Sequence, residues 1–137
     1  MTSASTSLLI TGARQADGTS GDLFVADGRF ADPADAPAGV HRVDADGLLA
    51  LPGLVDLHTH LRQPGREDAE TVATGTAAAA RGGFTCVHAM ANLTPATDTA
   101  EAAEYVQALG EREGHCEVRV VGAVTKGLGG SELSELA

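Results

Sequence analysis

The sequence predicts an α/β protein, in which a β-rich segment precedes the alternating strands and helices of a parallel sheet or barrel. Short apolar runs separated by Asp-Gly turns fill residues 1–51, and no helix of useful length fits there. After Pro52-Gly53, apolar runs alternate with segments of high helix propensity. Only 3% of the 137 residues are aromatic, and the abundance of Ala and Gly favours close helix–sheet packing.

The β-rich segment is predicted to consist of short strands and tight turns. The run 8–11 reads as a strand, and 22–31 reads as a hairpin around Asp27-Gly28, because both turn residues tolerate positive φ. A second hairpin is expected at 43–51, with Asp46-Gly47 as its turn.

Three strands and three helices are predicted after this segment. The strands are expected at 54–61, 84–90 and 118–124, and the helices at 67–81, 98–113 and from Ser131 onward. Acidic residues would occupy the first turn of the first helix, with Gly82-Gly83 as its stop. Asp98 and Glu101 have the spacing of a capping box for the second helix. The third strand is nearly all apolar, as expected for a parallel strand buried on both faces.

The charge balance excludes several classes of function. Nine Lys and Arg against nineteen Asp and Glu give a net charge of −10, which disfavours nucleic acids and anionic membrane surfaces as partners. No apolar run approaches the roughly 18 residues of a membrane span, and the N-terminus lacks a basic signal region. We therefore expect a cytoplasmic protein, with Cys86 and Cys116 as reduced, buried thiols.

The segment that could carry chemistry is Asp56-Leu57-His58-Thr59-His60-Leu61-Arg62. Alternate side chains of a strand share a face, so His58 and His60 could bind one divalent cation, with Asp56 and Arg62 on the same side. The opposite face is expected to pack outward against helices through Val55, Leu57, Thr59 and Leu61.

Two further polar residues, Asp56 and His88, can be interpreted as structural as well as functional. Asp56 could orient a metal-bound histidine, or its carboxylate could be satisfied by backbone donors. His88, on the second predicted strand, is interpreted as a hydrogen-bonded core histidine rather than a group beside a metal.

Five stretches of the chain resemble the dihydroorotases of the amidohydrolase superfamily. They are LPGLVDLHTHLR (51–62), QPGREDAET (63–71), TGTAAAARGGFT (74–85), MANLTP (90–95) and GAVTKG (122–127). The resemblance covers most of the chain from about Leu8 onward, and it is most specific from Pro52 to Gly83.

The resemblance implies a fold and a division of the chain. It implies the N-terminal part of a (β/α)8 TIM barrel, preceded by part of a small β-sandwich domain. Residues 1–51 would belong to the β-sandwich domain, and 52–137 would form the first three β/α units of an incomplete barrel.

The resemblance also implies an activity. The family interconverts N-carbamoyl-L-aspartate and L-dihydroorotate in de novo pyrimidine biosynthesis, by means of a metal-bound hydroxide. His58 and His60 match zinc ligands, and His60, Arg62 and Asn92 match residues around the bound substrate. Two zinc ions per complete site are implied, with the general acid/base aspartate and further ligands beyond Ala137, so the 137-residue chain alone is expected to be inactive.

The sequence departs from the family pattern around the substrate loop. Thr59 stands where Val is usual, Ala91 replaces Pro and Leu93 replaces Thr, and these last two changes are expected to loosen the loop that carries Asn92.

Two alternatives to a dihydroorotase stay open at this point. One is another cyclic amidohydrolase, such as an allantoinase or a dihydropyrimidinase. The other is a non-catalytic partner of aspartate transcarbamoylase. A small-molecule substrate, a homodimer and an association with aspartate transcarbamoylase are the partners compatible with the resemblance.

Overall fold

The computed structural model describes residues 7–136, which belong to two compact units, Met1–Pro52 and Gly53–Ala137. Each unit has its own sheet. No helix in the described part of the chain is long and apolar enough to cross a lipid bilayer.

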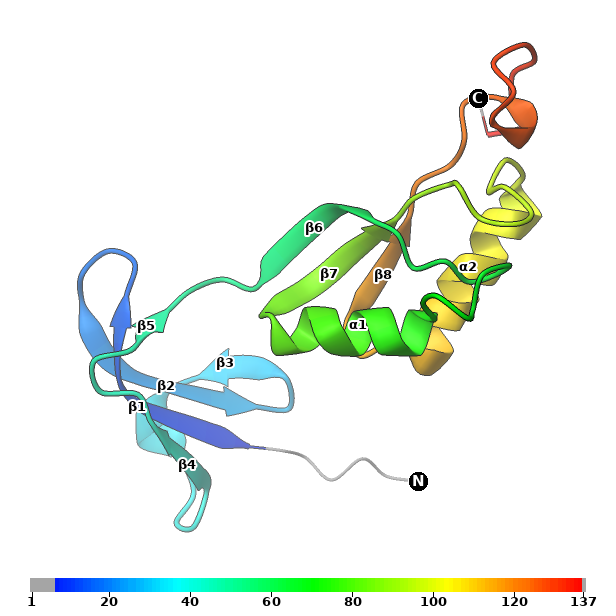
Figure 1. Cartoon of the computed structure of the whole chain (residues 1–137). Coiled ribbons are helices and arrows are strands. Elements are labelled where there is room, and N and C mark those ends of the chain that lie inside the picture. Colours follow the sequence, from blue (N-terminus) through cyan, green and yellow to red (C-terminus); the bar gives the residue numbers. More distant parts are fainter. Residues whose placement is uncertain (1–6, 137) are drawn as a thin grey trace. The chain divides into compact units, whose positions relative to one another are not determined.

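The first unit is a five-stranded sheet (Figure 1). Its strands are β1 (Leu8–Gln15), β2 (Ser20–Ala26), β3 (Arg29–Ala31), β4 (His41–Asp44) and β5 (Leu49–Ala50). The order is β3-β2-β1-β4, and β5 pairs with the end of β1. A short 3₁₀ helix, η1 (Pro33–Asp35), lies between β3 and β4. Leu9, Ala13 and Phe24 are buried in this unit.

One predicted hairpin is confirmed and the other is wrong. β2 and β3 pair antiparallel around Asp27 and Gly28, whose φ angles are 51° and 74°. β4 and β5 do not pair with each other, because both run parallel to β1. Buried Ala45 donates its N–H to the Thr11 carbonyl at 2.8 Å, so the chain stays beside β1 after β4.

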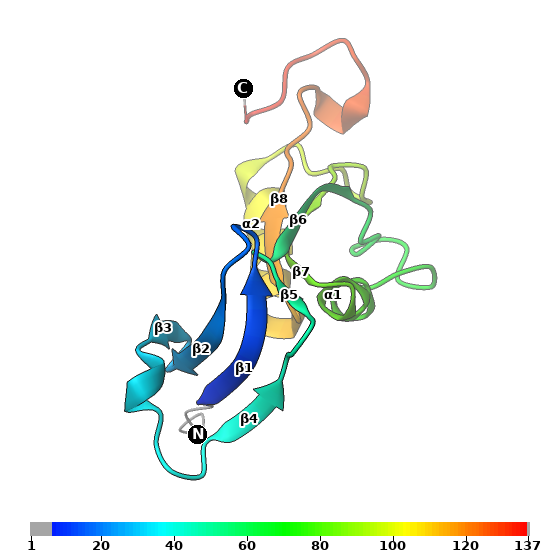
Figure 2. The same cartoon turned by 90° about the vertical axis from the view of Figure 1, so that its left-hand side faces the viewer.

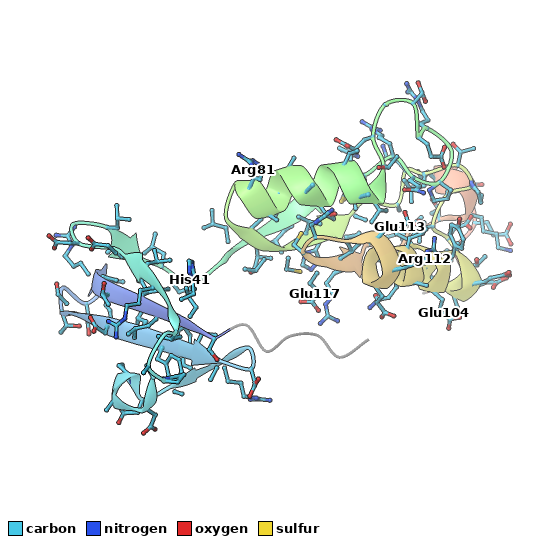
Figure 3. All side chains as sticks on the ribbon, turned by 90° about the horizontal axis from the view of Figure 1, so that it is seen from below. His41, Arg81, Glu104, Arg112, Glu113 and Glu117 are labelled. Carbon is cyan, nitrogen blue, oxygen red and sulfur yellow. The ribbon has the colours of Figure 1, made fainter. Side chains whose placement is uncertain are left out.

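The second unit is a parallel sheet with two helices against it (Figures 1 and 2). The strands β6 (Leu54–Thr59), β7 (Phe84–Ala89) and β8 (Glu117–Val120) lie in that order, and the helices are α1 (Val72–Arg81) and α2 (Ala100–Glu113). The core combines residues of strands, helices and the loops that follow the strands: Leu61, Val72, Val87, Ala89, Leu93, Val106, Leu109 and Val118. Charged side chains, among them Glu104, Arg112 and Glu113, extend from α2 (Figure 3).

Both helices begin later than the sequence predicts. Thr71 caps α1 in a reciprocal pair with Thr74, and no acidic residue lies in the first turn. The segment before it is taken up by turns, in which Arg66 donates its N–H to the Arg62 carbonyl. Thr99, not Asp98, caps α2, because the Asp98 carboxylate accepts the Gly127 N–H at 2.7 Å. The predicted ends of both helices, at 81 and 113, are confirmed, and Gly82 and Gly114 are their C-caps.

The C-terminal part differs most from expectation. β8 ends at Val120, and it is not buried on both faces: Glu117 and Arg119 are exposed and form an ion pair. The expected helix after Ser131 is wrong, since 131–136 forms bends and a bridge to Thr125. Backbone groups there bond across the loop, as in Lys126 N–H to the Glu132 carbonyl.

Candidate active site

The two histidines lie together at the C-terminal end of β6, as the alternation of the strand predicts. The His58 and His60 rings are 5.1 Å apart between centroids, at an interplanar angle of 68°. Two imidazole nitrogens on one tetrahedral zinc ion would be roughly 3.4 Å apart, given bonds of about 2.0–2.1 Å. The two rings are therefore close enough to share a cation.

Asn92 reaches the same place from the next strand. It follows β7, and its Oδ1 lies 2.9 Å from Nδ1 of His60. The carboxyl ends of parallel strands meet at one edge of a sheet, which is where active sites of barrel folds are found. The structure thus brings together His58, His60 and Asn92, three of the four site residues predicted from the sequence; the fourth is Arg62.

Arg62 lies in the loop that leaves β6. Its φ angle is +62°, a left-handed conformation that is uncommon for a residue with a side chain and is often found at functional sites. Within residues 7–136, no carboxylate lies within 4.0 Å of its guanidinium. The site thus contains a half-buried cation that no acidic side chain of the described chain neutralises.

The loop around Asn92 is packed, not loosened. Ala91 and Leu93 are 5% and 9% exposed, and Leu93 belongs to the core. The Leu93 and Thr97 N–H groups both donate to the Ala91 carbonyl, at 2.9 and 3.0 Å. Replacing Pro and Thr of the family pattern by Ala and Leu therefore leaves the loop anchored, contrary to the expectation from sequence.

The loop after β6 is clamped to the loop after β7, a feature that the sequence analysis missed. Thr94 donates its N–H to the Pro64 carbonyl at 3.1 Å. Gly65 has a φ of +108°, and a Cβ there would lie 2.5 Å from Cβ of Thr94. The available signal was the Pro-Gly pair at 64–65, which the sequence analysis used only as part of the resemblance over 63–71.

The Asp56 carboxylate has a backbone donor, as the structural interpretation of this residue predicts. Its Oδ1 accepts the His58 N–H at 2.9 Å, and this hydrogen bond lowers the pKa of the carboxyl. His88 places Nδ1 3.2 Å from the Asp56 carbonyl oxygen, so it is hydrogen-bonded as predicted, but it is half-buried and does not belong to the core. Asp56 thus bonds to the backbone of His58, and His88 bonds to the backbone of Asp56, so both groups support β6 and its neighbour β7.

The opposite face of β6 is not packed as predicted. Val55 and Leu57 are 52% and 69% exposed, whereas Leu61, beyond the strand, is 1% exposed. The prediction placed helices against this face, but β6 is an edge strand that pairs only with β7. Leu61, in the loop after the strand, lies in the core close to Gly75 of α1.

The donor set fits part of a metal site. Two imidazoles are good ligands for zinc, and one of them has an amide partner on its other ring nitrogen. Residues 7–136 contain no group of three or more His, Cys, Asp or Glu side chains placed to hold a metal. The described residues therefore offer two adjacent imidazoles to a metal, which is fewer than a complete ligand set.

Comparisons with known proteins give one consistent family. The family model described as "Dihydro-orotase-like" matches residues 47–137. Curated dihydroorotases from Leifsonia xyli, Streptomyces coelicolor and Mycobacterium tuberculosis are 59%, 52% and 47% identical over 93%, 93% and 95% of the chain. The chain spans about 30% of the length of these relatives.

Solved structures agree on the fold. An L-hydantoinase (dihydropyrimidinase) from Arthrobacter aurescens superposes with a TM-score of 0.75 and 25% identity, over 86% of this chain and 28% of that one. A D-hydantoinase gives a TM-score of 0.66 at 21% identity. These neighbours are amidohydrolase barrels, which confirms the predicted fold class. The match over residues 47–137 shows that this chain belongs to the dihydroorotase-like family, whose members use a metal cofactor.

Proposed function

We propose that the protein to which this chain belongs is a zinc-dependent dihydroorotase, which interconverts N-carbamoyl-L-aspartate and L-dihydroorotate. The observation that carries the proposal is the 59% identity to a curated dihydroorotase over 93% of the chain. In this proposal His58 and His60 are two of the ligands, and two zinc ions complete the site with residues from elsewhere in the protein. When bound, the metal would supply a hydroxide nucleophile and polarise the amide carbonyl of the ring.

The chain's own residues account for recognition of the substrate carboxylate. Arg62 offers a planar fork of donors that matches a carboxylate, and it lies two residues beyond His60 in a loop clamped to the loop of Asn92. Asn92 still has its amide N–H groups for the same anion, because its oxygen faces His60. His60 would then lie beside both the metal and the substrate.

Two neutral-substrate activities compete with this proposal. Hydantoinases act on cyclic amides, and an L-hydantoinase shares the fold at 25% identity. Hydantoin and allantoin have no carboxylate, so they give Arg62 no partner. An anionic substrate uses both Arg62 and Asn92, and we favour it for that reason.

The test starts from the gene's natural product, purified from the cells that make it. Its intact mass and zinc content would be measured, followed by hydrolysis of L-dihydroorotate, hydantoin and allantoin at equal concentration. We expect zinc-dependent turnover of dihydroorotate alone, and Arg62→Lys should raise KM much more than it lowers kcat. Preferential turnover of hydantoin or allantoin would replace the proposal with another cyclic amidohydrolase, and zinc-free, inactive protein would favour the non-catalytic partner of aspartate transcarbamoylase.

We also propose that the natural protein forms a homodimer and that it associates with aspartate transcarbamoylase. Size-exclusion chromatography with light scattering on the natural product tests the first. Co-elution with added aspartate transcarbamoylase tests the second.

A further inference from the structure

The contact between Asn92 and His60 gives Asn92 a role that substrate binding alone does not require. The two residues come from different strands, β6 and β7, and their polar atoms are 2.9 Å apart. An amide oxygen can only accept a hydrogen bond, so the partner ring nitrogen, Nδ1, has to carry the proton. A neutral imidazole with its proton on Nδ1 has its lone pair on Nε2.

The position of Asn92 is set by its neighbours on both sides. Ala91 and Leu93 are buried, and the Ala91 carbonyl accepts two backbone N–H groups from the same loop. Thr94, two residues on, is bonded to the Pro64 carbonyl in the loop that follows His60. The loop that presents Asn92 is thus attached both to the core and to the segment that carries its partner.

We propose that Asn92 is a positioning residue for His60. Its amide oxygen holds the His60 ring in the Nδ1–H tautomer and fixes the ring's orientation, so that Nε2 faces the cation site beside His58. The same side chain keeps its amide N–H groups for the substrate, and so it couples the metal ligand to the anion-binding group. This inference rests on the proposed function for its biological use, but the tautomer itself belongs to the chain without metal.

The first test measures the tautomer directly. Long-range ¹H–¹⁵N correlation spectra of the metal-free 137-residue chain, at a pH where the imidazoles are neutral, assign the proton of each histidine ring. We expect His60 to carry it on Nδ1. In Asn92→Ala the proton should return to the Nε2-favoured mixture of an unconstrained imidazole, and in Asn92→Asp, which keeps an acceptor oxygen, it should stay on Nδ1.

The second test measures metal affinity without reference to turnover. Cobalt(II), which reports its ligands by its visible spectrum, would be titrated into each variant of the chain. Asn92→Ala should weaken binding by about tenfold or more, the usual effect of removing such a supporting partner, whereas Asn92→Asp should bind at least as tightly as the parent. Gln107→Ala removes an amide from α2 in the same unit and should change neither readout.

Two results would overturn the inference. One is a His60 ring protonated on Nε2 in the parent chain, which would mean that the amide presents its N–H to the ring. The other is an unchanged tautomer and cobalt affinity in Asn92→Ala, provided that its amide spectrum shows an intact fold. Neither depends on turnover, so failure of the dihydroorotase proposal leaves this test readable, and the reverse also holds.

Discussion

At the scale of single residues, hydrogen bonds lower the pKa of a carboxyl in an exposed turn. Asp17 lies in the turn between β1 and β2, where one oxygen accepts both the hydroxyl and the backbone N–H of Thr19, at 2.7 and 2.9 Å. The Thr19 hydroxyl is the larger cause, and the two bonds together lower the pKa of Asp17. Donors that favour the charged form of a carboxyl are a recognised source of such a shift.

The Asp17 turn predicts a pH dependence with a definite sign. A carboxyl whose folded pKa is lowered adds stability above its unfolded pKa of about 3.9, and that stability is lost as pH falls through the folded value. Thr19→Val removes the hydroxyl donor, so the Asp17 pKa, measured by ¹³C NMR titration, should rise toward its ordinary value. Ser20→Ala, at the next position, should leave it unchanged, and a Thr19→Val titration identical to that of the parent would contradict the assignment.

The same scale shows where sequence reasoning about the site succeeds. The parity of a strand is a local property, so the meeting of His58 with His60 could be predicted from two letters and their spacing. The contact of Asn92 with His60 spans 32 positions, and in the sequence only the resemblance placed both residues around the bound substrate. No local pattern indicates that its oxygen bonds to a ring nitrogen.

At the scale of elements, the caps show how neighbouring residues compete for one role. Asp98 and Thr99 can both accept from the first turn of α2, and the structure assigns that role to Thr99. Asp98 instead binds the Gly127 N–H in the loop after β8, a partner that lies 29 positions away. The choice between two good capping residues is therefore made by tertiary contacts.

Substitutions at the start of α2 separate the two capping hypotheses. Thr99→Ala should lower the free energy of unfolding by about 1 kcal/mol, the usual cost of losing such a cap. Glu101→Ala should cost less than about 0.5 kcal/mol, because no capping box engages Glu101. Urea unfolding followed by circular dichroism measures both, and a larger loss for Glu101→Ala would restore the box predicted from sequence.

Helix α2 also contains a glycine, Gly110, whose replacement by alanine should lower the free energy of unfolding, although helix propensity alone predicts an increase. Alanine at an ordinary helical position is about 1 kcal/mol better than glycine. At Gly110, however, a Cβ would lie 2.5 Å from Cβ of buried Val118 on β8. Gly110→Ala should therefore destabilise the unit by about 1–3 kcal/mol, as overpacking does.

A matched substitution on the same helix tests this interpretation. Ala108 is exposed, so Ala108→Gly should show the ordinary propensity loss of roughly 0.5–1 kcal/mol. If Gly110→Ala raised the free energy of unfolding, the helix and β8 would be less closely packed than the structure shows.

At the scale of the whole molecule, apolar side chains on the edge strand β6 are exposed. Leu54, Val55 and Leu57 are 48%, 52% and 69% exposed, on a strand that pairs only with β7. Unpaired edges with apolar side chains promote association between chains. We expect the 137-residue chain to self-associate as its concentration rises, and Leu57→Lys to reduce this in light scattering.

The control keeps the charge change and moves it away from the edge. Tyr105 is 51% exposed on α2, so Tyr105→Lys removes an exposed aromatic ring from a helix and leaves β6 unchanged. Equal reduction by both variants would point to net charge rather than to β6 as the cause.

The ligand set predicts the activity of the chain taken alone. Residues 7–136 bring together the two histidines that we propose as metal ligands and no group of three, whereas catalytic zinc sites use about three protein ligands. We expect no hydrolysis of L-dihydroorotate by the 137-residue chain with added zinc. Metal-dependent turnover that disappears in His58→Ala would contradict this expectation.

The sequence by itself determined the features that depend on near neighbours along the chain. Alternation set the shared face of His58 and His60, Asp27-Gly28 set the first hairpin, and glycine set the end of each helix. Only the tertiary structure decided how β4 and β5 pair, which residue caps α2, and how much of β6 is covered. These depend on contacts between distant segments, where several partners of similar local propensity compete and packing selects one.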